Sequence, residues 1–337
     1  MSHRVGKALS HESWKLFAFA SFLALAAAGF APLASAQDKL TFMTSWFAQA
    51  EHGGFYQALA KGLYRQQGLD VTIKMGGPQV NGMQLMLAGQ TDLHMGYDFQ
   101  VLKSLEQELT PVTVAASFQN DLQGMLAHDD VPNLGALKGK TILVATAGRT
   151  SWWPWLKQKY GYTEEQVRPY TFNLQPFFAD RNIAQQGYMT SEPFQAEKGG
   201  AKARFFLFAR DGFPPYGTTI VATQKMVKEK SDTVARFVRA SMEGWKSYLE
   251  DPAAANELIK KDNPNMKDDQ LAYSLAKLKE NQIITGGDAG KMGIGIMTDE
   301  RWKKTYDYMS SAGLLKPEVD YRQAFTTQFV RDLRVMP

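Results

Sequence analysis

Residues 39–75, KLTFMTSWFAQAEHGGFYQALAKGLYRQQGLDVTIKM, contain a strand, a helix and a second strand in succession. Residues 39–44 alternate apolar and polar side chains, which is typical of a half-buried strand. Residues 52–67 carry apolar side chains at helical spacing, and Gly68 is a suitable helix stop before a strand at 69–75. Two strands separated by one helix predict a parallel β-α-β unit.

The same alternation continues along the chain. Further strands are expected at residues 92–96, 112–118, 141–146, 187–189, 204–208 and 217–223, and further helices at 81–88, 99–107, 151–160 and 231–250. This order predicts an α/β fold with two lobes, a hinge and an interlobe cleft. We expect the first lobe to hold residues 37–120 and 218–337, and the second to hold 121–217. Ligands usually bind at such domain interfaces and at the carboxyl ends of parallel strands.

The first 36 residues are expected to form a signal peptide. Arg4, Lys7 and Lys15 precede an apolar run at residues 16–30, and a small-residue Ala-Ser-Ala site ends at residue 36. The alternative, a membrane anchor, is disfavoured because a spanning helix needs roughly 20 apolar residues. The sequence therefore predicts an exported periplasmic protein that begins near Gln37.

Composition excludes several classes of protein. Without the expected leader, the chain holds 35 Lys and Arg residues against 33 Asp and Glu residues, which does not resemble the basic surface of a nucleic-acid-binding protein. The chain has no cysteine, which excludes thiol catalysis and cysteine-bound zinc or iron–sulfur centres. Neither a metal-ligand cluster nor a catalytic motif is evident, so no cofactor, no metal, no catalytic function and a monomer are expected.

Three segments carry a resemblance to a known family. Trp46, followed by His52, Gly54 and Tyr56, resembles the opening of the NMT1/THI5-like solute-binding family. The stretches LMLAGQTDLHMGY (85–97) and LGALKGKTILVAT (134–146) are similar to later segments of that family, so the resemblance runs over most of the chain.

The resemblance implies a type II periplasmic binding fold that closes on its ligand and delivers it to an ABC permease. Members bind the thiamine pyrimidine precursor or riboflavin, and relatives bind alkanesulfonates, taurine or nitrate. Fungal relatives synthesise the thiamine pyrimidine, but their activity depends on a cysteine-rich segment that is missing from this chain. A carrier is therefore preferred over a synthase.

Candidate ligand-binding residues follow the expected strands. In the first lobe these are Trp46, His52, Tyr56, Gly77, Asn81, Tyr97 and Asp98. Aromatic rings would stack on a planar ligand, and Gly77 permits close approach of the backbone. The alternatives are that His52 and Asp98 cap helices and that Tyr56 faces the core.

The second lobe adds Trp152, Trp153, Tyr188 and Glu192, and Tyr216 lies at the second crossing. Three tryptophans lie within four residues, 152–155, at a strand-to-helix junction where Ser151 is expected to be the N-cap. At least one of these rings is expected in the core, given the area that each one buries.

Two ligand classes remain open at this point. The aromatic supply, with Asp98 and Glu192 as hydrogen-bond acceptors, favours a planar heteroaromatic nutrient. The alternative is an anion held by helix N-termini and Arg149. Two acids in the cleft would oppose that alternative.

Overall fold

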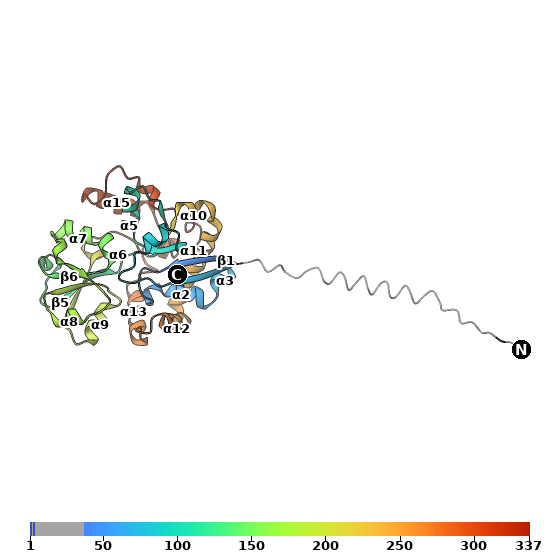
Figure 1. Ribbon diagram of the computed structural model, residues 1–337, viewed down its shortest axis with the longest axis horizontal. Helices are drawn as coiled ribbons and strands as arrows, with labels where there is room; N and C mark the ends of the chain where they lie inside the picture. The colour runs from blue at the N-terminus through green and yellow to red at the C-terminus, as the bar shows by residue number, and fades with distance from the viewer. Residues whose placement is uncertain (2, 4–36) are drawn as a thin grey trace. The chain divides into compact units, whose positions relative to one another are not determined.

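The computed structural model describes residues 1, 3 and 37–337 of the chain. The expected signal peptide lies, apart from residues 1 and 3, outside the described residues. Residues 37–337 form one compact unit in which two five-stranded sheets are flanked by helices (Figure 1). The predicted α/β class is confirmed.

The first sheet collects strands from both ends of the compact unit. Its order is β2 (Leu69–Lys74), β1 (Asp38–Met43), β3 (Leu93–Gly96), β10 (Gly217–Thr223) and β4 (Pro111–Phe118). β1 pairs in parallel with β2 and β3, as the opening β-α-β unit predicts. β10 lies antiparallel between β3 and β4, so the returning strand fills the middle of this sheet.

The second sheet is built from the middle of the chain. Its order is β7 (Val167–Pro169), β6 (Thr141–Val144), β8 (Ile183–Tyr188), β5 (Gln123–His128) and β9 (Ala203–Leu207). β6 is parallel to β7 and β8, whereas β5 is antiparallel to β8 and β9. The chain passes between the sheets at residues 119–122 and again at 208–216.

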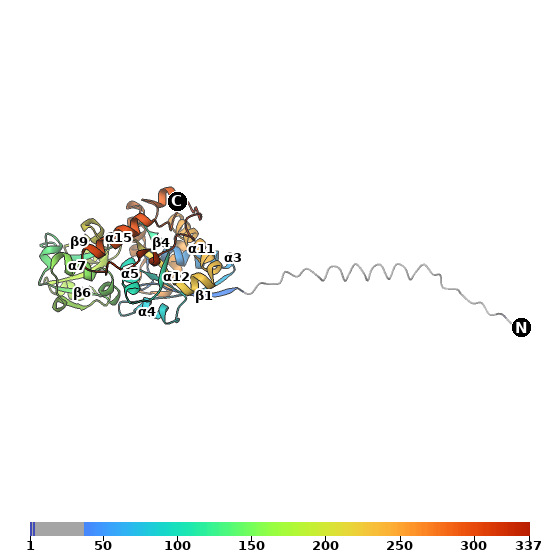
Figure 2. The same cartoon turned by 90° about the horizontal axis from the view of Figure 1, so that it is seen from above.

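Helices cover both sheets, and the views in Figures 1 and 2 show the two groups around their own strands. Those that precede β10 are α2 (Gly53–Ala60), α3 (Leu63–Gln66), α4 (Gly82–Leu87), α5 (Asp98–Glu106), α6 (Thr146–Thr150), α7 (Trp153–Tyr160), α8 (Gln175–Ala179) and α9 (Glu192–Lys198). Those that follow it are α10 (Gln224–Glu229), α11 (Ser231–Glu250), α12 (Ala253–Asp262), α13 (Asp268–Glu280), α14 (Ala289–Met292) and α15 (Asp299–Ser311). Short 3₁₀ helices are η1 (Ala50–His52), η2 (Leu134–Leu137), η3 (Glu164–Gln166), η4 (Phe208–Asp211) and η5 (Tyr321–Ala324). None of the helices in the described part of the chain is both long and apolar enough to cross a membrane.

The predicted helix over residues 52–67 is wrong in its continuity. The chain forms η1, α2 and α3 instead, with Gly62 between α2 and α3 at a φ of 69°. A left-handed residue cannot continue a right-handed helix, and glycine takes that conformation without a steric penalty. The apolar spacing was correct, but it does not reveal a break whose flanks keep the same buried face.

The predicted N-cap at Ser151 is also wrong. Trp152 holds the N-cap position of α7, and the Ser151 hydroxyl donates instead to the carbonyl of Ala147, 2.8 Å away. The short helix α6 occupies residues 146–150, so Ser151 completes α6 rather than starting α7.

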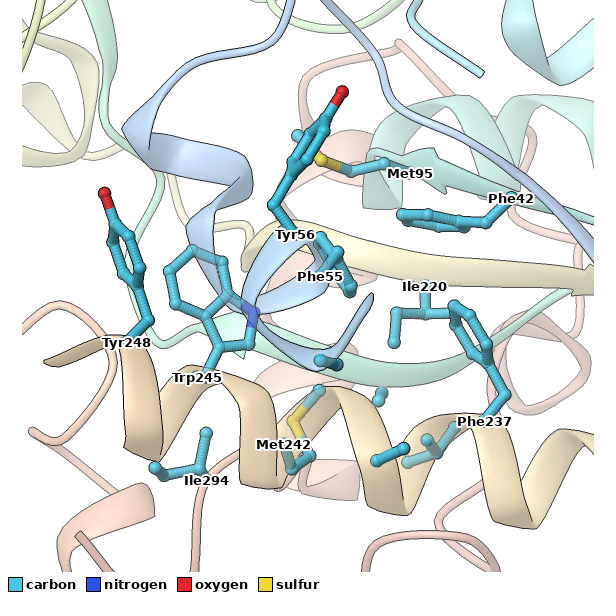
Figure 3. Packing of buried hydrophobic residues seen from close by; sticks show 14 of the residues in the cluster. Phe42, Phe55, Tyr56, Met95, Ile220, Phe237, Met242, Trp245, Tyr248 and Ile294 are labelled. Carbon is cyan, nitrogen blue, oxygen red and sulfur yellow. The ribbon is translucent and has the colours of Figure 1, made fainter. Parts of the chain in front are cut away.

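Helix α11 and helix α2 pack at very close range against the first sheet (Figure 3). A Cβ atom on Gly54 would lie 2.2 Å from Cγ of Trp245, and one on Gly244 would lie 2.2 Å from the carbonyl oxygen of Gly54. Both glycines are therefore required for the approach of the two helices. The predicted range of α11 is confirmed, and its apolar stripe includes the buried residues Phe237 and Trp245.

The segment after α13 joins both crossings between the sheets. At the first crossing, the Gln119 amide N–H donates to Ile283 and its side-chain amide donates to the carbonyl of Ile296. At the second crossing, the Tyr216 hydroxyl accepts the Thr298 N–H at 3.0 Å. The Arg301 guanidinium lies 4.0 Å from the centre of the Tyr216 ring. One late segment thus supports both connections.

Candidate functional site

An aromatic pair bridges the two sheets where β1 and β7 end. Trp46 follows β1, Tyr170 follows β7, and their ring centroids lie 5.8 Å apart with planes only 15° from parallel. Phe172 meets Trp46 edge-on at 6.0 Å. Trp46 is 7% exposed and Tyr170 is fully buried. The two rings therefore face each other from opposite sides of the interlobe seam.

Two tyrosines meet next to this pair. Tyr97 follows β3 of the first sheet, and Tyr188 ends β8 of the second. Their hydroxyl oxygens lie 3.1 Å apart, and the Tyr97 hydroxyl also lies 3.4 Å from the Ser45 hydroxyl. Burial raises the pKa of Tyr97 to about 12, so both hydroxyls stay protonated at neutral pH.

Glu192 links these two features. One carboxylate oxygen accepts the Tyr170 hydroxyl at 2.7 Å, and the other accepts the Tyr188 backbone N–H at 2.7 Å. Gly187 allows this approach, because a Cβ atom there would lie 2.8 Å from the Glu192 side chain. Burial raises the pKa of Glu192 to about 7, with the two hydrogen bonds acting in the opposite direction.

Glu51 and His52 form the 3₁₀ turn that leads into α2, and both are buried. The Thr190 hydroxyl of the second lobe donates to Glu51 Oε1. Glu51 Oε2 and both His52 ring nitrogens have no hydrogen-bond partner within the described residues. Burial raises the pKa of Glu51 and lowers the pKa of His52 to about 3, so the histidine is neutral. The alternative in which the His52 side chain caps its helix is wrong, since it makes no capping bond.

A buried polar chain extends from the first crossing into the second lobe. Asp121 accepts the Gln123 side-chain amide at 2.8 Å, and Gln123 in turn accepts the indole N–H of Trp152 at 2.6 Å. Burial raises the pKa of Asp121 to about 6. Trp152 is thus fixed in the interior of the second lobe, as sequence analysis expects for at least one of the three tryptophans.

Four other predicted residues are engaged away from the aromatic pair. The Tyr56 ring lies in the core of the first lobe and its hydroxyl donates to Asp262 at 2.9 Å (Figure 3). The Trp153 indole donates to Glu164 at 3.1 Å. Asp98 is the first residue of α5 rather than its N-cap, and its carboxylate accepts the Tyr216 N–H at 3.0 Å. The alternative in which Asp98 is the N-cap is therefore wrong.

The loop with Gly77 and Asn81 touches the second lobe through its backbone. The Pro78 carbonyl accepts the Thr146 N–H at 2.8 Å, whereas the Asn81 side chain caps α4. A groove of about 490 Å³ lies nearby, lined mainly by α4 and α5 and by Thr150. Neither Trp46 nor Tyr170 lines this groove, so we place the candidate site in the interlobe seam itself.

The seam is acidic and lacks cations. Among residues 37–337 the buried carboxylates are Glu51, Asp98, Asp121 and Glu192, and no Lys or Arg of this part of the chain is buried. Arg149, the predicted anion ligand, has a side chain 44% exposed and lies 3.9 Å from Glu164. In the part of the chain that the structure describes, no group of three or more acidic or histidine side chains could hold a metal ion.

Sequence analysis missed three residues of this seam: Glu51, Tyr170 and Thr190. Glu51 directly precedes a residue that was singled out, and Tyr170 follows a strand of only three residues. The rule that ligand residues follow strands would have found Tyr170 if β7 had been recognised.

Comparisons with known proteins agree with this arrangement. The sequence model described as NMT1/THI5 like matches residues 49–255. The riboflavin-binding protein RibY of Chloroflexus aurantiacus is 26% identical over 317 residues, covering 89% of both chains. The formylaminopyrimidine-binding protein of Halalkalibacterium halodurans is 25% identical over 311 residues, covering 87% of this chain and 91% of that protein.

Solved structures share the fold at low sequence identity. The alkanesulfonate-binding protein SsuA from Xanthomonas axonopodis pv. citri has a TM-score of 0.63 at 14% identity, covering 87% of this chain and 99% of that one. The desulfurization enzyme DSZB has a TM-score of 0.57 at 12% identity, covering 88% and 99%. The predicted two-lobed periplasmic binding protein fold is confirmed, and the fold by itself does not distinguish a carrier from an enzyme.

Proposed function

Because the chain belongs to the NMT1/THI5-like family, we propose that it is a periplasmic solute-binding protein that delivers a small planar heteroaromatic nutrient to an ABC importer. Relatives named for binding riboflavin and formylaminopyrimidine, each aligned over most of this chain, support that ligand class. The sequence of residues 1–36, which is typical of a signal peptide, supports export.

The observation that carries the proposal is the pair formed by Trp46 and Tyr170. The rings come from different sheets and lie nearly parallel, so a planar ligand that enters between them as the lobes part would be stacked on both faces. Glu192 holds the Tyr170 hydroxyl and thereby fixes one wall of this clamp.

The charge of the seam supports a ligand that donates hydrogen bonds. Glu51, Asp121 and Glu192 are buried acceptors, and ring N–H groups or amines would satisfy acceptors of this kind. A sulfonate or nitrate would place its charge beside these acids without any buried Lys or Arg in the described residues. The same acids therefore argue against the anion alternative.

Two features support a carrier rather than an enzyme. The relatives aligned over most of the chain are named binding proteins. The chain also has no cysteine, so the cysteine-dependent chemistry of pyrimidine synthesis has no donor here. We infer that closure and release, with residues 119–122 and 208–216 as hinges, constitute its working cycle.

Thermal melting with added compounds tests the ligand class. A ligand present at about 100 times its Kd stabilises the folded state by about 2.7 kcal/mol, which gives a clear rise in Tm. We expect this rise with riboflavin or N-formylaminopyrimidine and none with taurine, nitrate or an alkanesulfonate. Stabilisation by the anions alone would overturn the proposal. Mass spectrometry after long incubation should recover the bound compound unchanged, and turnover would restore the enzyme alternative.

A further inference from the structure

Glu51 contacts the second lobe through only one of its two carboxylate oxygens. Oε1 accepts the Thr190 hydroxyl, whereas Oε2 is buried and has no partner within the described residues. A buried carboxylate oxygen that accepts no hydrogen bond carries a free-energy cost, and a donor placed there would remove it.

Hydroxyl groups around Glu51 have other partners. The Tyr248 hydroxyl donates to Asn256 at 3.3 Å, and the Tyr188 hydroxyl lies within hydrogen-bond distance of Tyr97. The adjacent His52 adds two further buried nitrogens without partners. Three unpartnered polar atoms in two consecutive residues, at the seam between the lobes, point to a ligand rather than to an internal contact.

The Thr190 turn is held from two directions. Its hydroxyl binds Glu51, and its carbonyl accepts Ser274 at 2.7 Å and the Gln270 side-chain amide at 3.1 Å, both from α13. Glu51 therefore belongs at once to the interlobe contact and to the polar wall of the seam.

We propose that Glu51 Oε2 accepts an amino or ring N–H donor of the ligand, while Oε1 keeps the Thr190 contact that holds the lobes together. This inference rests on the proposed function and deepens it. The ligand class becomes a heterocycle with a donor, and Glu51 becomes the residue that selects for that donor.

Paired compounds test the selection. One pair is 4-amino-2-methylpyrimidine and 2,4-dimethylpyrimidine, which differ by a donor group of nearly equal size. The second pair is riboflavin and 3-methylriboflavin, in which the ring N–H is blocked. We expect the wild-type protein to prefer the donor in at least one pair by about 10- to 100-fold in Kd, the range for a hydrogen bond to a charged group.

The variants separate selection from closure. Glu51→Met lacks an acceptor and should abolish the preference, and Glu51→Gln, a weaker neutral acceptor, should reduce it at least several-fold. Thr190→Val should weaken both members of a pair equally and keep the preference. Should Glu51→Met fail to fold by circular dichroism, the result for Glu51→Gln decides.

The outcomes distinguish the two claims. Equal affinity of the wild-type protein for both members of each pair, or an unchanged preference in the Glu51 variants, overturns the role of Glu51 alone. A steric preference against 3-methylriboflavin would survive in Glu51→Met and count against the inference. If the wild-type protein binds none of the four compounds, the proposed ligand class fails and the inference fails with it.

Discussion

The hydroxyl oxygens of Tyr97 and Tyr188 lie 3.1 Å apart, although the two residues extend from different sheets. This contact exists only while the lobes are together. It belongs to the closed arrangement, which a ligand between the lobes would favour.

Removing either hydroxyl should therefore weaken binding. Tyr97→Phe and Tyr188→Phe are each expected to raise the ligand Kd by about 2- to 10-fold, the range for one neutral hydrogen bond. Isothermal titration calorimetry on both single variants and the double variant would show whether the losses are coupled. Tyr64→Phe is the control, since its hydroxyl contacts Ser241 inside the first lobe. A similar loss of affinity in Tyr64→Phe would contradict an interlobe role.

The aromatic clamp predicts a separation of affinity from stability. Trp46→Ala and Tyr170→Ala should each weaken a planar ligand by about ten- to a hundredfold, by analogy with base–aromatic stacking. Trp155→Ala, in the core of the second lobe, should instead cost about 3–5 kcal/mol of unfolding free energy. Fluorescence titration and urea unfolding on the three variants measure both quantities. The clamp is wrong if Trp46→Ala binds like the wild-type protein.

Close packing of α2 on α11 makes Gly54 intolerant of a side chain. Gly54→Ala should lower the unfolding free energy by about 1–3 kcal/mol, because its Cβ would lie 2.2 Å from Trp245. The exposed Gly135 is a matched control, since the nearest atom to its Cβ, at 3.2 Å, belongs to the Asn133 side chain, which can move. Gly135→Ala should change stability by less than about 0.5 kcal/mol. Equal effects of the two substitutions in urea unfolding would refute the packing argument.

Asp98 predicts a pH dependence of stability. Burial raises its pKa to about 7, from the ordinary value of 3.8. Below about pH 4 the carboxyl is protonated in both the folded and the unfolded chain. Between pH 4 and 7 only the unfolded chain releases the proton, so stability falls as pH rises, by at most about 1.4 kcal/mol per pH unit.

Asp98→Asn tests that dependence. The amide keeps an acceptor for the Tyr216 N–H but has no proton to release. The variant should gain stability relative to the wild-type protein as pH rises from 4 to 7, and the gain should level off above pH 7. Urea unfolding at half-unit intervals measures the difference. Parallel stability curves for the two proteins would show that Asp98 titrates normally.

Most elements were predictable where the side-chain pattern is strong. The α11 stripe fixed residues 231–250 because one face of that helix is buried along its length. Strand β5 was missed because QGMLAH, residues 123–128, is buried at every position and shows no alternation. Gly62 gave a break that apolar spacing does not report.

The site was predictable only in part, for a physical reason. Trp46, Tyr97, Tyr188 and Glu192 follow strands, and the strand-end rule placed all four in one seam. Their partners depend on how the two lobes meet, and no local pattern encodes that meeting. Tyr170 and Thr190 were missed for this reason, and Tyr56 was assigned to the cleft although its hydroxyl contacts Asp262.

The position of β10 has a consequence for the order in which the chain can fold. The second sheet is continuous, from residue 123 to residue 207, and can pair as soon as that stretch is available. In the first sheet, β4 reaches β3 only through β10, which lies about 100 residues further along the chain than β4. Contacts of such long sequence separation form slowly. An early intermediate would therefore hold a paired second lobe and a first sheet limited to β2, β1 and β3, with the edges of β3 and β4 open until residue 223 arrives.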